Sequence, residues 1–254
     1  MSRVLLTIAG FDPSAGAGVL LDLKVFARHG FQGVSALTGV TVQNTETVKS
    51  VHPFPGNLLL RQYRALADDI GLSGIKVGMA AVESQLKAIS GILRENRDIP
   101  RVIDPVFRSS SGAWLLEPKA LPLFLRRIGK HATVLTPNMD EAGRLTGSAV
   151  RNIPEMIAAA KAIYEIARSP CLVTGGHLEG EAVNCLFDGR RIFLFGKKRL
   201  KKDVHGTGCI FSSSLLCYLA MGRRLERAAE LATEFTHEAI RTSVRIGRGR
   251  PVFR

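Results

Sequence analysis

Long apolar segments are missing from this sequence of 254 residues: no run approaches the roughly 20 residues that a helix needs to cross a bilayer. A secretory signal is missing too, because residues 1–10 hold only a short apolar stretch before a turn. We expect that stretch to be a first core strand. The four cysteines include no CxxC pair, and none lies at zinc-ligand spacing from a histidine. Such cysteine usage is typical of a reducing compartment, so we expect a cytoplasmic protein.

Aromatic and acidic residues are also scarce. Aromatic residues make up 6% of the chain, and 22 acidic residues stand against 35 basic ones, which gives a net charge of +13. A nucleic-acid interface would concentrate basic charge on one face and add exposed aromatics. Here the basic residues are scattered, except at 197–202 and in the C-terminal tail. This distribution favours a solvated surface that attracts anionic small molecules over one that binds nucleic acid.

Hydrophobic side chains are abundant, at 46% of the chain, which is enough for a core without disulfides or metals. Apolar β-rich runs alternate with helical patterns, which predicts an α/β protein with a mostly parallel sheet. Strands are expected at 4–9, 33–40, 74–77, 101–103, 133–135 and 170–173. Helices are expected at 17–28, 57–70, 82–95, 140–145, 153–167, 208–221 and 225–244. Residues 184–187 and 190–195 predict a hairpin joined by a two-residue turn, Asp188-Gly189. No linker or repeat interrupts the pattern, so residues 1–254 are expected to form one domain.

The segment His205-Gly206-Thr207-Gly208-Cys209 leads directly into an apolar helical run. Its glycines permit a tight turn, and the helix N-terminus offers unpaired N–H groups and the positive end of a dipole. We therefore expect Gly206, Thr207 and Gly208 to form an anion hole for charge that develops during phosphoryl transfer. Cys209 would lie in the first helical turn, where the dipole favours a thiolate that could take a proton from a hydroxyl. The competing interpretation is an ordinary glycine-rich turn beside a buried cysteine.

Two polar side chains lie near the ends of the first two predicted strands, where open parallel sheets bind ligands. Asp22 follows the small-residue turn at 10–18 and could accept hydrogen bonds from a substrate amino or hydroxyl group. Gln43 could donate and accept at once, which suits a heterocycle with adjacent ring nitrogen and amino groups. A solvated helix carboxylate and a satisfied loop amide are the structural alternatives.

Two carboxylates accompany Pro-containing turns after later strands. Asp104 ends one strand, and Glu141 follows Thr136-Pro137-Asn138 after the next. Directly or through water, they could hold Mg²⁺ against nucleotide phosphates. Asn138 also fits a helix N-cap, so a purely structural role competes. Residues 173–177 end a further strand with two glycines, as a loop lying against a nucleotide could.

The order of these motifs resembles the hydroxymethylpyrimidine and phosphomethylpyrimidine kinases of thiamine biosynthesis, which have the ribokinase-like fold. The resemblance covers nearly the whole chain, from Thr7 to about Gly249. Its most specific elements are 9–24, 43–45, 76–79, 104–106, 136–138 with Glu141, 175–177 and 205–209.

The resemblance implies an α/β/α sandwich, assembled as a homodimer, that transfers the γ-phosphate of ATP with Mg²⁺. The acceptors would be 4-amino-5-hydroxymethyl-2-methylpyrimidine and then its monophosphate. The residues implied around the pyrimidine are Gly10, Asp22, Gln43, Met79, Val106 and Cys209. Those implied for the nucleotide are Asn138, Thr174, Gly176 and His205, with Asp104 and Glu141 for Mg²⁺. Gly206, Thr207 and Gly208 would form the anion hole, and Cys209 would be the base.

Four positions depart from the family pattern. Thr174 stands where the family usually has Lys, Asn184 where it often has Asp, and Val204 and Ile210 where it usually has Thr. These changes lie mostly on the nucleotide side and indicate an altered grip on phosphate. Positive charge at Arg108 or at 197–202 is a candidate replacement.

Two other functions stay open beside the pyrimidine kinase. Many pyridoxal kinases carry Asp where Cys209 stands, but some carry Cys, so pyridoxal or pyridoxine kinase activity is the second hypothesis. A pyrimidine-binding protein with weakened nucleotide binding is the third. The departures at Thr174, Asn184, Val204 and Ile210 motivate it, whereas Asp104, Glu141 and Cys209 argue against it.

Overall fold

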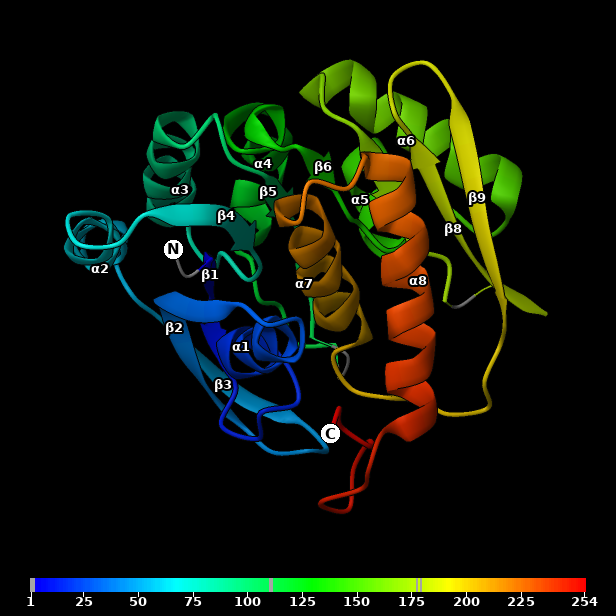
Figure 1. Ribbon diagram of the computed structural model, residues 1–254, viewed down its shortest axis with the longest axis horizontal. Coiled ribbons are helices and arrows are strands. Elements are labelled where there is room, and N and C mark those ends of the chain that lie inside the picture. The colour runs from blue at the N-terminus through cyan, green and yellow to red at the C-terminus, as the bar shows by residue number, and fades with distance from the viewer. Residues whose placement is uncertain (1–2, 110–111, 177, 179) are drawn as a thin grey trace.

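The computed structural model describes residues 3–109, 112–176, 178 and 180–254, and it places one sheet between two layers of helices (Figure 1). Within these residues, nine strands form a single sheet in the order β3-β2-β1-β4-β5-β6-β7-β8-β9. The strands are β1 Val4–Phe11, β2 Gln32–Gln43, β3 Val48–Pro53, β4 Leu72–Val77, β5 Arg101–Ile103, β6 Val134–Leu135, β7 Cys171–Val173, β8 Glu181–Phe187 and β9 Ile192–Lys198. The helices are α1 Gly18–Arg28, α2 Gly56–Ala67, α3 Glu83–Glu95, α4 Leu121–Arg127, α5 Met139–Thr146, α6 Ile153–Ala167, α7 Thr207–Ala220 and α8 Leu225–Thr242. The predicted mostly parallel α/β/α sandwich is confirmed.

Six central strands run parallel, and antiparallel strands form the two edges of the sheet. β2, β1, β4, β5, β6 and β7 pair in parallel, whereas β3 pairs antiparallel with β2, and β8 and β9 form an antiparallel hairpin beside β7. β3 can follow β2 closely because Asn44 closes the turn: its Oδ1 accepts the N–H groups of Glu46 and Thr47, both at 2.9 Å. The sheet therefore places the carboxyl ends of its parallel strands along one edge.

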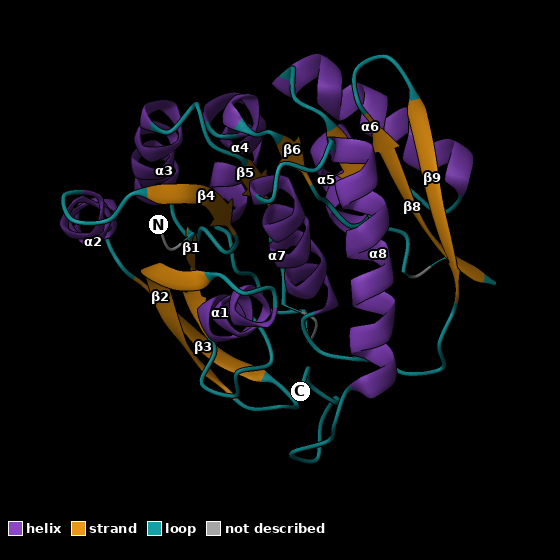
Figure 2. Ribbon diagram, viewed as in Figure 1, coloured by secondary structure: helices purple, strands orange, loops and turns teal. Residues whose placement is uncertain are grey.

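Successive residues of the central strands point to opposite helix layers, as the period of a strand requires. Leu5 and Val134 pack with α1, α7 and α8, whereas their chain neighbours Leu6 and Leu135 pack with α2 to α6. Figure 2 shows α1, α7 and α8 on one side of the sheet and α2 to α6 on the other. Because both faces are covered, the strands are apolar throughout rather than alternating, which is why the sequence shows them as continuous runs.

The structure differs from the sequence prediction in three elements. β3 and α4 were not predicted: β3 is a half-exposed strand with polar residues, and α4 is a short helix with Pro122 in its first turn. The β8–β9 connection runs from Asp188 to Arg191 rather than being the predicted two-residue turn. It is closed by Asp188 Oδ1, which accepts the N–H groups of Arg190 and Arg191 at 2.8 and 2.7 Å. Among the described residues, no helix combines the length and apolar character that a bilayer crossing demands.

Candidate active site

The turn before α7 is built on a close approach between two glycine-containing loops. Gly206 is the N-cap of α7 with φ of +76°, and a Cβ there would lie 2.1 Å from the carbonyl oxygen of Gly16. No residue with a side chain fits this position. The first helical hydrogen bond goes from Ile210 N to Gly206 O at 2.9 Å. The N–H groups of Thr207, Gly208 and Cys209 therefore have no acceptor within the helix, which is the arrangement that an anion hole needs.

Cys209 lies half-buried in the first turn of α7, beside the apolar side chains of Leu21 and Val25. Burial raises the pKa of the Cys209 thiol to about 12; Lys76 acts in the opposite direction, whereas Asp22 and Asp104 raise it further. The expectation of a thiolate in the free protein was therefore wrong. The helix dipole is outweighed by loss of solvent and by two nearby carboxylates, so the sulfur carries a proton at neutral pH.

Asp22 is fully buried in a hydrogen-bonded network beneath this turn. Its carboxylate pairs with Lys76 Nζ at 2.6 Å, and both side chains are 0% exposed. The hydroxyls of Thr7 and Ser213 donate to the same carboxylate at 2.6 and 2.8 Å. Burial alone would lower the pKa of Lys76, but Asp22 raises it above the ordinary value, so the ammonium stays charged. The structure thus places Asp22 below the candidate pyrimidine contacts, with three protein donors on its oxygens.

Asp104 and Glu141 form a second pair of buried ionisable groups. Asp104 follows β5, is 4% exposed, and accepts a hydrogen bond from Ser212 Oγ at 2.9 Å. Glu141 is 6% exposed and belongs to a capping box with Asn138: Glu141 Oε2 accepts from Asn138 N at 2.8 Å, and Asn138 Oδ1 accepts from Glu141 N at 2.9 Å. Burial, followed by the nearby Asp104 carboxylate, raises the pKa of Glu141 well above its usual range. Burial likewise raises the pKa of Asp104, although Lys76 and Ser212 oppose it.

Two buried carboxylates whose pKa values are both raised suit a divalent cation, which would offset their charge. Outside the uncertain positions 1–2, 110–111, 177 and 179, no group of three or more His, Cys, Asp or Glu side chains is arranged to hold a metal ion. Mg²⁺ in kinases needs only one or two carboxylates, because substrate phosphates and water complete its octahedral shell. Asp104 and Glu141 therefore fit Mg²⁺ held together with a nucleotide.

The ring of His205, which we expected at the nucleotide, lies instead with the β1–α1 loop and the end of β2. Its Nε2 atom is 3.0 Å from Gln43 Nε2 and 3.2 Å from Asp12 Oδ2. Although burial opposes it, hydrogen bonds from His205 and Ser14 lower the pKa of Asp12. An ionised Asp12 also accepts the N–H of Ala17 at 2.9 Å, which fixes the loop that Gly206 touches. The side chain of Gln43 is thereby oriented by His205, which belongs to the turn before α7.

Three of the residues implied for the pyrimidine lie together in this structure. Met79 is 6% exposed and packs in an apolar cluster that Val106 borders. A Cβ at Gly10 would lie 2.6 Å from Met79 Cε, so Gly10 gives this side chain its room. Together they offer a small apolar wall beside the polar groups of Gln43 and Asp12.

A cavity of about 900 Å³ opens beside the turn, on the side of β8, β9 and α8. Its lining includes five residues expected from the sequence, namely Asn138, Thr174 and Gly176 for the nucleotide and Thr207 and Gly208 for the anion hole. The lining also contains a series that sequence reasoning missed, namely Thr233, Thr236, His237 and Ile240 of α8, and Asp203 and Arg250. The α8 residues recur at helical spacing on one face, which was the available signal. His177, expected in the loop after β7, lies outside the described residues.

Three of the positions that depart from the family pattern, Thr174, Asn184 and Val204, line this cavity, and the first two are polar. Asn184 donates from Nδ2 to Thr233 Oγ1 at 3.0 Å, and its Oδ1 accepts the N–H of Gly175 at 3.3 Å. Thr174 offers a hydroxyl and no charge; its backbone N–H is held by Pro137 O at 2.9 Å. This wall of the cavity is therefore polar and uncharged.

Sequence comparison finds relatives over nearly the whole chain. A family model described as "Phosphomethylpyrimidine kinase" matches residues 12–253. The hydroxymethylpyrimidine/phosphomethylpyrimidine kinase of Aquifex aeolicus is 34% identical over 248 residues, which covers 97% of each chain.

Comparison of structures finds the same architecture in two kinds of vitamin kinase. The ADP complex of Bacillus subtilis pyridoxal kinase superposes with a TM-score of 0.92 at 30% identity, over 100% of this chain and 97% of that one. The phosphomethylpyrimidine kinase of Clostridium difficile superposes with a TM-score of 0.82 at 33% identity, over 94% of this chain and 100% of that one.

Proposed function

Because this chain belongs to the phosphomethylpyrimidine kinase family, we propose that it transfers the γ-phosphate of ATP to 4-amino-5-hydroxymethyl-2-methylpyrimidine and then to the monophosphate. Family membership makes it a kinase of thiamine biosynthesis. The observation that carries the proposal is the turn before α7. Thr207 and Gly208 line the cavity of about 900 Å³, while Cys209 and Asp104 lie directly beside them.

The residues divide into an acceptor side and a donor side. Gly10, Gln43, Met79 and Val106 would surround the pyrimidine, with Gln43 supplying hydrogen bonds to ring nitrogen and amino groups. Asn138, Thr174 and Gly176 would lie along the nucleotide. The anion hole of Gly206, Thr207 and Gly208 would stabilise the charge on the phosphoryl group as it moves between the two sides.

Asp104 and Glu141 would hold Mg²⁺ against the phosphates, where the cation would offset negative charge on the transferred group. Cys209 would accept the proton of the attacking hydroxyl. Only the thiolate can accept that proton, so the Cys209 thiol must first release its own proton to solvent, a loss that the positive charge of Lys76 favours. The monophosphate is already an anion and needs little help from a base.

Incubation of the purified protein with Mg²⁺, ATP and the pyrimidine alcohol tests the proposal. We expect the monophosphate to form first and the diphosphate after it, and separation of the products at successive times measures both. A folded protein that makes neither product would overturn the assignment.

Pyridoxal phosphorylation is the second candidate, because the Bacillus subtilis pyridoxal kinase superposes more closely than the Clostridium difficile phosphomethylpyrimidine kinase, at 0.92 against 0.82. A competition assay with both alcohols in one tube separates the two functions by their relative kcat/KM. We expect the pyrimidine to be preferred.

We also propose that the protein works as a homodimer in the cytoplasm. The first statement rests on the resemblance of the sequence to this kinase family, and the second rests on its cysteine usage. Light scattering on the purified protein tests the first, since a mass near 27.6 kDa would show a monomer. Fractionation of cells tests the second.

A further inference from the structure

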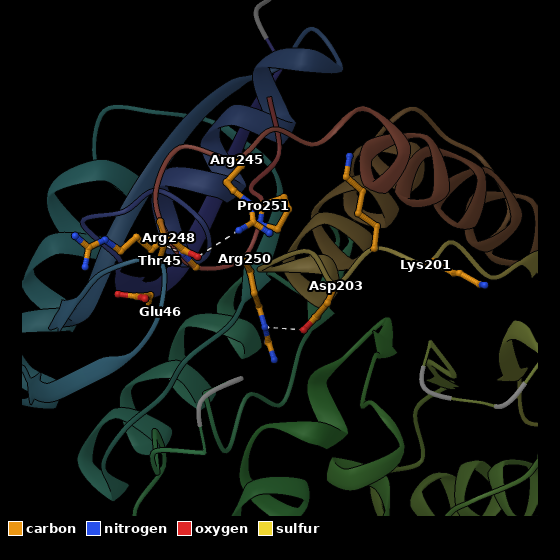
Figure 3. Close-up of a pocket in the computed structure, with 10 residues that line it drawn as sticks. Thr45, Glu46, Lys201, Asp203, Arg245, Arg248, Arg250 and Pro251 are labelled. Atoms are coloured by element: carbon orange, nitrogen blue, oxygen red, sulfur yellow. Dashed lines mark hydrogen bonds and ion pairs between the residues drawn. The ribbon is translucent and has the colours of Figure 1, made fainter.

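Arg250 lies where the nucleotide cavity meets a second, smaller one. The second cavity, of about 520 Å³, is formed by the C-terminal tail, the β2–β3 turn and the segment before the catalytic turn. Arg250 and Asp203 line both cavities. Figure 3 shows their side chains lying together, while Arg248 and Lys201 point away from the pair. The guanidinium of Arg250 is therefore placed on the same cavity as Thr207 and Gly208.

Three other cations that line the cavity of about 900 Å³ are held by protein partners. Lys202 Nζ donates to the carbonyl oxygens of Arg241 and Ser243 at 3.2 and 2.8 Å, which caps the end of α8. Arg199 donates to Leu178 O at 2.9 Å, and Lys197 pairs with Glu234 at 3.3 Å. These contacts draw the three charges toward the outer wall formed by β9 and α8.

The backbone at Arg250 is fixed at several points. Its N–H donates to Thr45 O at 3.2 Å, and the N–H of Gly249 donates to Thr45 Oγ1 at 3.1 Å. On the other side, His205 N donates to Pro251 O at 2.9 Å. The tail thus connects the turn after Gln43 to the catalytic turn, and Arg250 projects from a rigid base rather than from a free end.

The present partner of Arg250 is a weak one. Arg250 Nε lies 2.8 Å from Asp203 Oδ2, but the two side chains are 38% and 70% exposed. Exposed ion pairs contribute little, because water screens them and two side chains must be ordered. Two oxygens of one phosphate group can accept hydrogen bonds from a guanidinium in a bidentate geometry. A polyphosphate also carries more negative charge than one carboxylate. A polyphosphate can therefore engage Arg250 at small cost.

We propose that Arg250 binds the terminal phosphates of the nucleotide and supplies the positive charge that the wall at Thr174 lacks. This inference rests on the kinase function proposed above. It assigns a phosphate contact to the C-terminal tail, far in sequence from the turn that forms the anion hole. Asp203 holds the guanidinium in place until the nucleotide arrives.

Calorimetry with AMP, ADP and a non-hydrolysable ATP analogue, each with Mg²⁺, tests the assignment in the full chain. Arg250→Gln keeps the bulk and removes the charge. We expect it to weaken binding of ADP and of the analogue about tenfold to a hundredfold, the usual effect of losing a charged hydrogen bond, and to leave AMP within about twofold. Arg248→Gln is the matched control: it lies on the same tail and lines only the smaller cavity, so all three affinities should be unchanged.

Three results would overturn the role of Arg250. The first is unchanged affinity of Arg250→Gln for the ATP analogue, and the second is an equal loss for AMP. A loss seen only in KM for the monophosphate acceptor would move Arg250 to the acceptor side and would also overturn it. If unmutated protein binds no nucleotide at all, the kinase function itself fails, which is a distinct outcome. Thermal unfolding of each variant, with Arg250→Lys as a second substitution that keeps the charge, shows whether the tail is still folded.

Discussion

At the scale of single residues, Cys209 is subject to opposing influences. The helix terminus and Lys76 favour its thiolate, whereas burial and the carboxylates of Asp22 and Asp104 disfavour it. In the free protein, burial and the two carboxylates outweigh the helix terminus and Lys76. With a pKa of about 12, about one thiol in 10⁵ is ionised at pH 7, and this fraction grows tenfold with each pH unit.

Replacement of Cys209 by Ala should therefore affect the two acceptors differently. We expect kcat/KM for the alcohol to fall about 10²- to 10⁴-fold, the usual contribution of a general base, and that for the monophosphate to fall less than about tenfold. For the unmutated enzyme, kcat/KM for the alcohol should rise with pH up to about pH 9, because the free-enzyme thiol titrates above that range. Cys217→Ala, at another buried thiol of α7, is the control and should keep both activities. Equal losses on both acceptors would remove Cys209 from the role of base.

Lys76 and Asp22 form a pair whose members are stable only together. Lys76→Met leaves the Asp22 carboxylate buried without a cation, and we expect it to lower the free energy of unfolding by about 3–5 kcal/mol. The double variant Lys76→Met/Asp22→Leu should recover part of that loss, since the two apolar side chains need no partner, whereas the buried hydroxyls of Thr7 and Ser213 lose their acceptor. Urea unfolding measures both. Arg64→Met breaks an exposed pair with Glu95 and should cost less than about 1 kcal/mol. A Lys76→Met protein as stable as the original would contradict the buried ion pair.

At the scale of elements, the start of α5 combines folding with function. Asn138 caps the helix and holds Glu141, the proposed Mg²⁺ ligand. We expect Asn138→Ala to lower stability by about 1 kcal/mol and to raise the Mg²⁺ concentration needed for half-maximal activity. Asn152→Ala removes the matching cap of α6, where Asn152 Oδ1 accepts from Glu155 N at 2.9 Å, and should cost similar stability with unchanged Mg²⁺ dependence. If both variants respond alike to Mg²⁺, the cap serves α5 only.

Elements with strong local signals were predictable from sequence, and those defined by distant contacts were not. The buried strand β1 is a nearly continuous apolar run, and α6 starts with an Asn cap and a proline. β3 was missed because its residues are polar and half-exposed, so it shows no apolar run. The turn at Gly206 was found from its glycines. Arg250 was missed because its position depends on a hydrogen bond to Thr45, about 200 residues earlier, which no local pattern encodes.

The position of His205 shows a second kind of limit. The sequence placed His205 in the right turn but on the wrong side of it, toward the nucleotide. Its ring turns to Asp12 and Gln43 because the loop after β1 packs against that turn at Gly16, where a Cβ would lie 2.2 Å from the ring. The direction of a side chain within a turn depends on its neighbours in space.

At the scale of the whole molecule, part of the net charge of +13 is concentrated at the cavity of about 900 Å³. Lys197, Lys198, Arg199, Lys201 and Lys202 line the cavity together with Arg250. The long-range attraction of these charges for a polyphosphate is screened by salt, whereas the neutral pyrimidine alcohol feels little of it.

Kinetics at two salt concentrations should therefore separate the two substrates. Raising ionic strength from about 0.1 M to about 1 M shortens the Debye length from about 10 Å to about 3 Å. We expect KM for ATP to rise several-fold and KM for the alcohol to stay within about twofold. Parallel increases in both values would show that salt acts on stability or on the acceptor side instead.

The buried pair of Lys76 and Asp22 also constrains how this sequence can diverge. Since loss of either charge alone leaves the other stranded without solvent, a lineage that changes one position passes through an unstable intermediate unless the second changes with it. Positions 22 and 76 are therefore expected to covary among descendants of this chain, although 54 residues separate them and neither touches solvent.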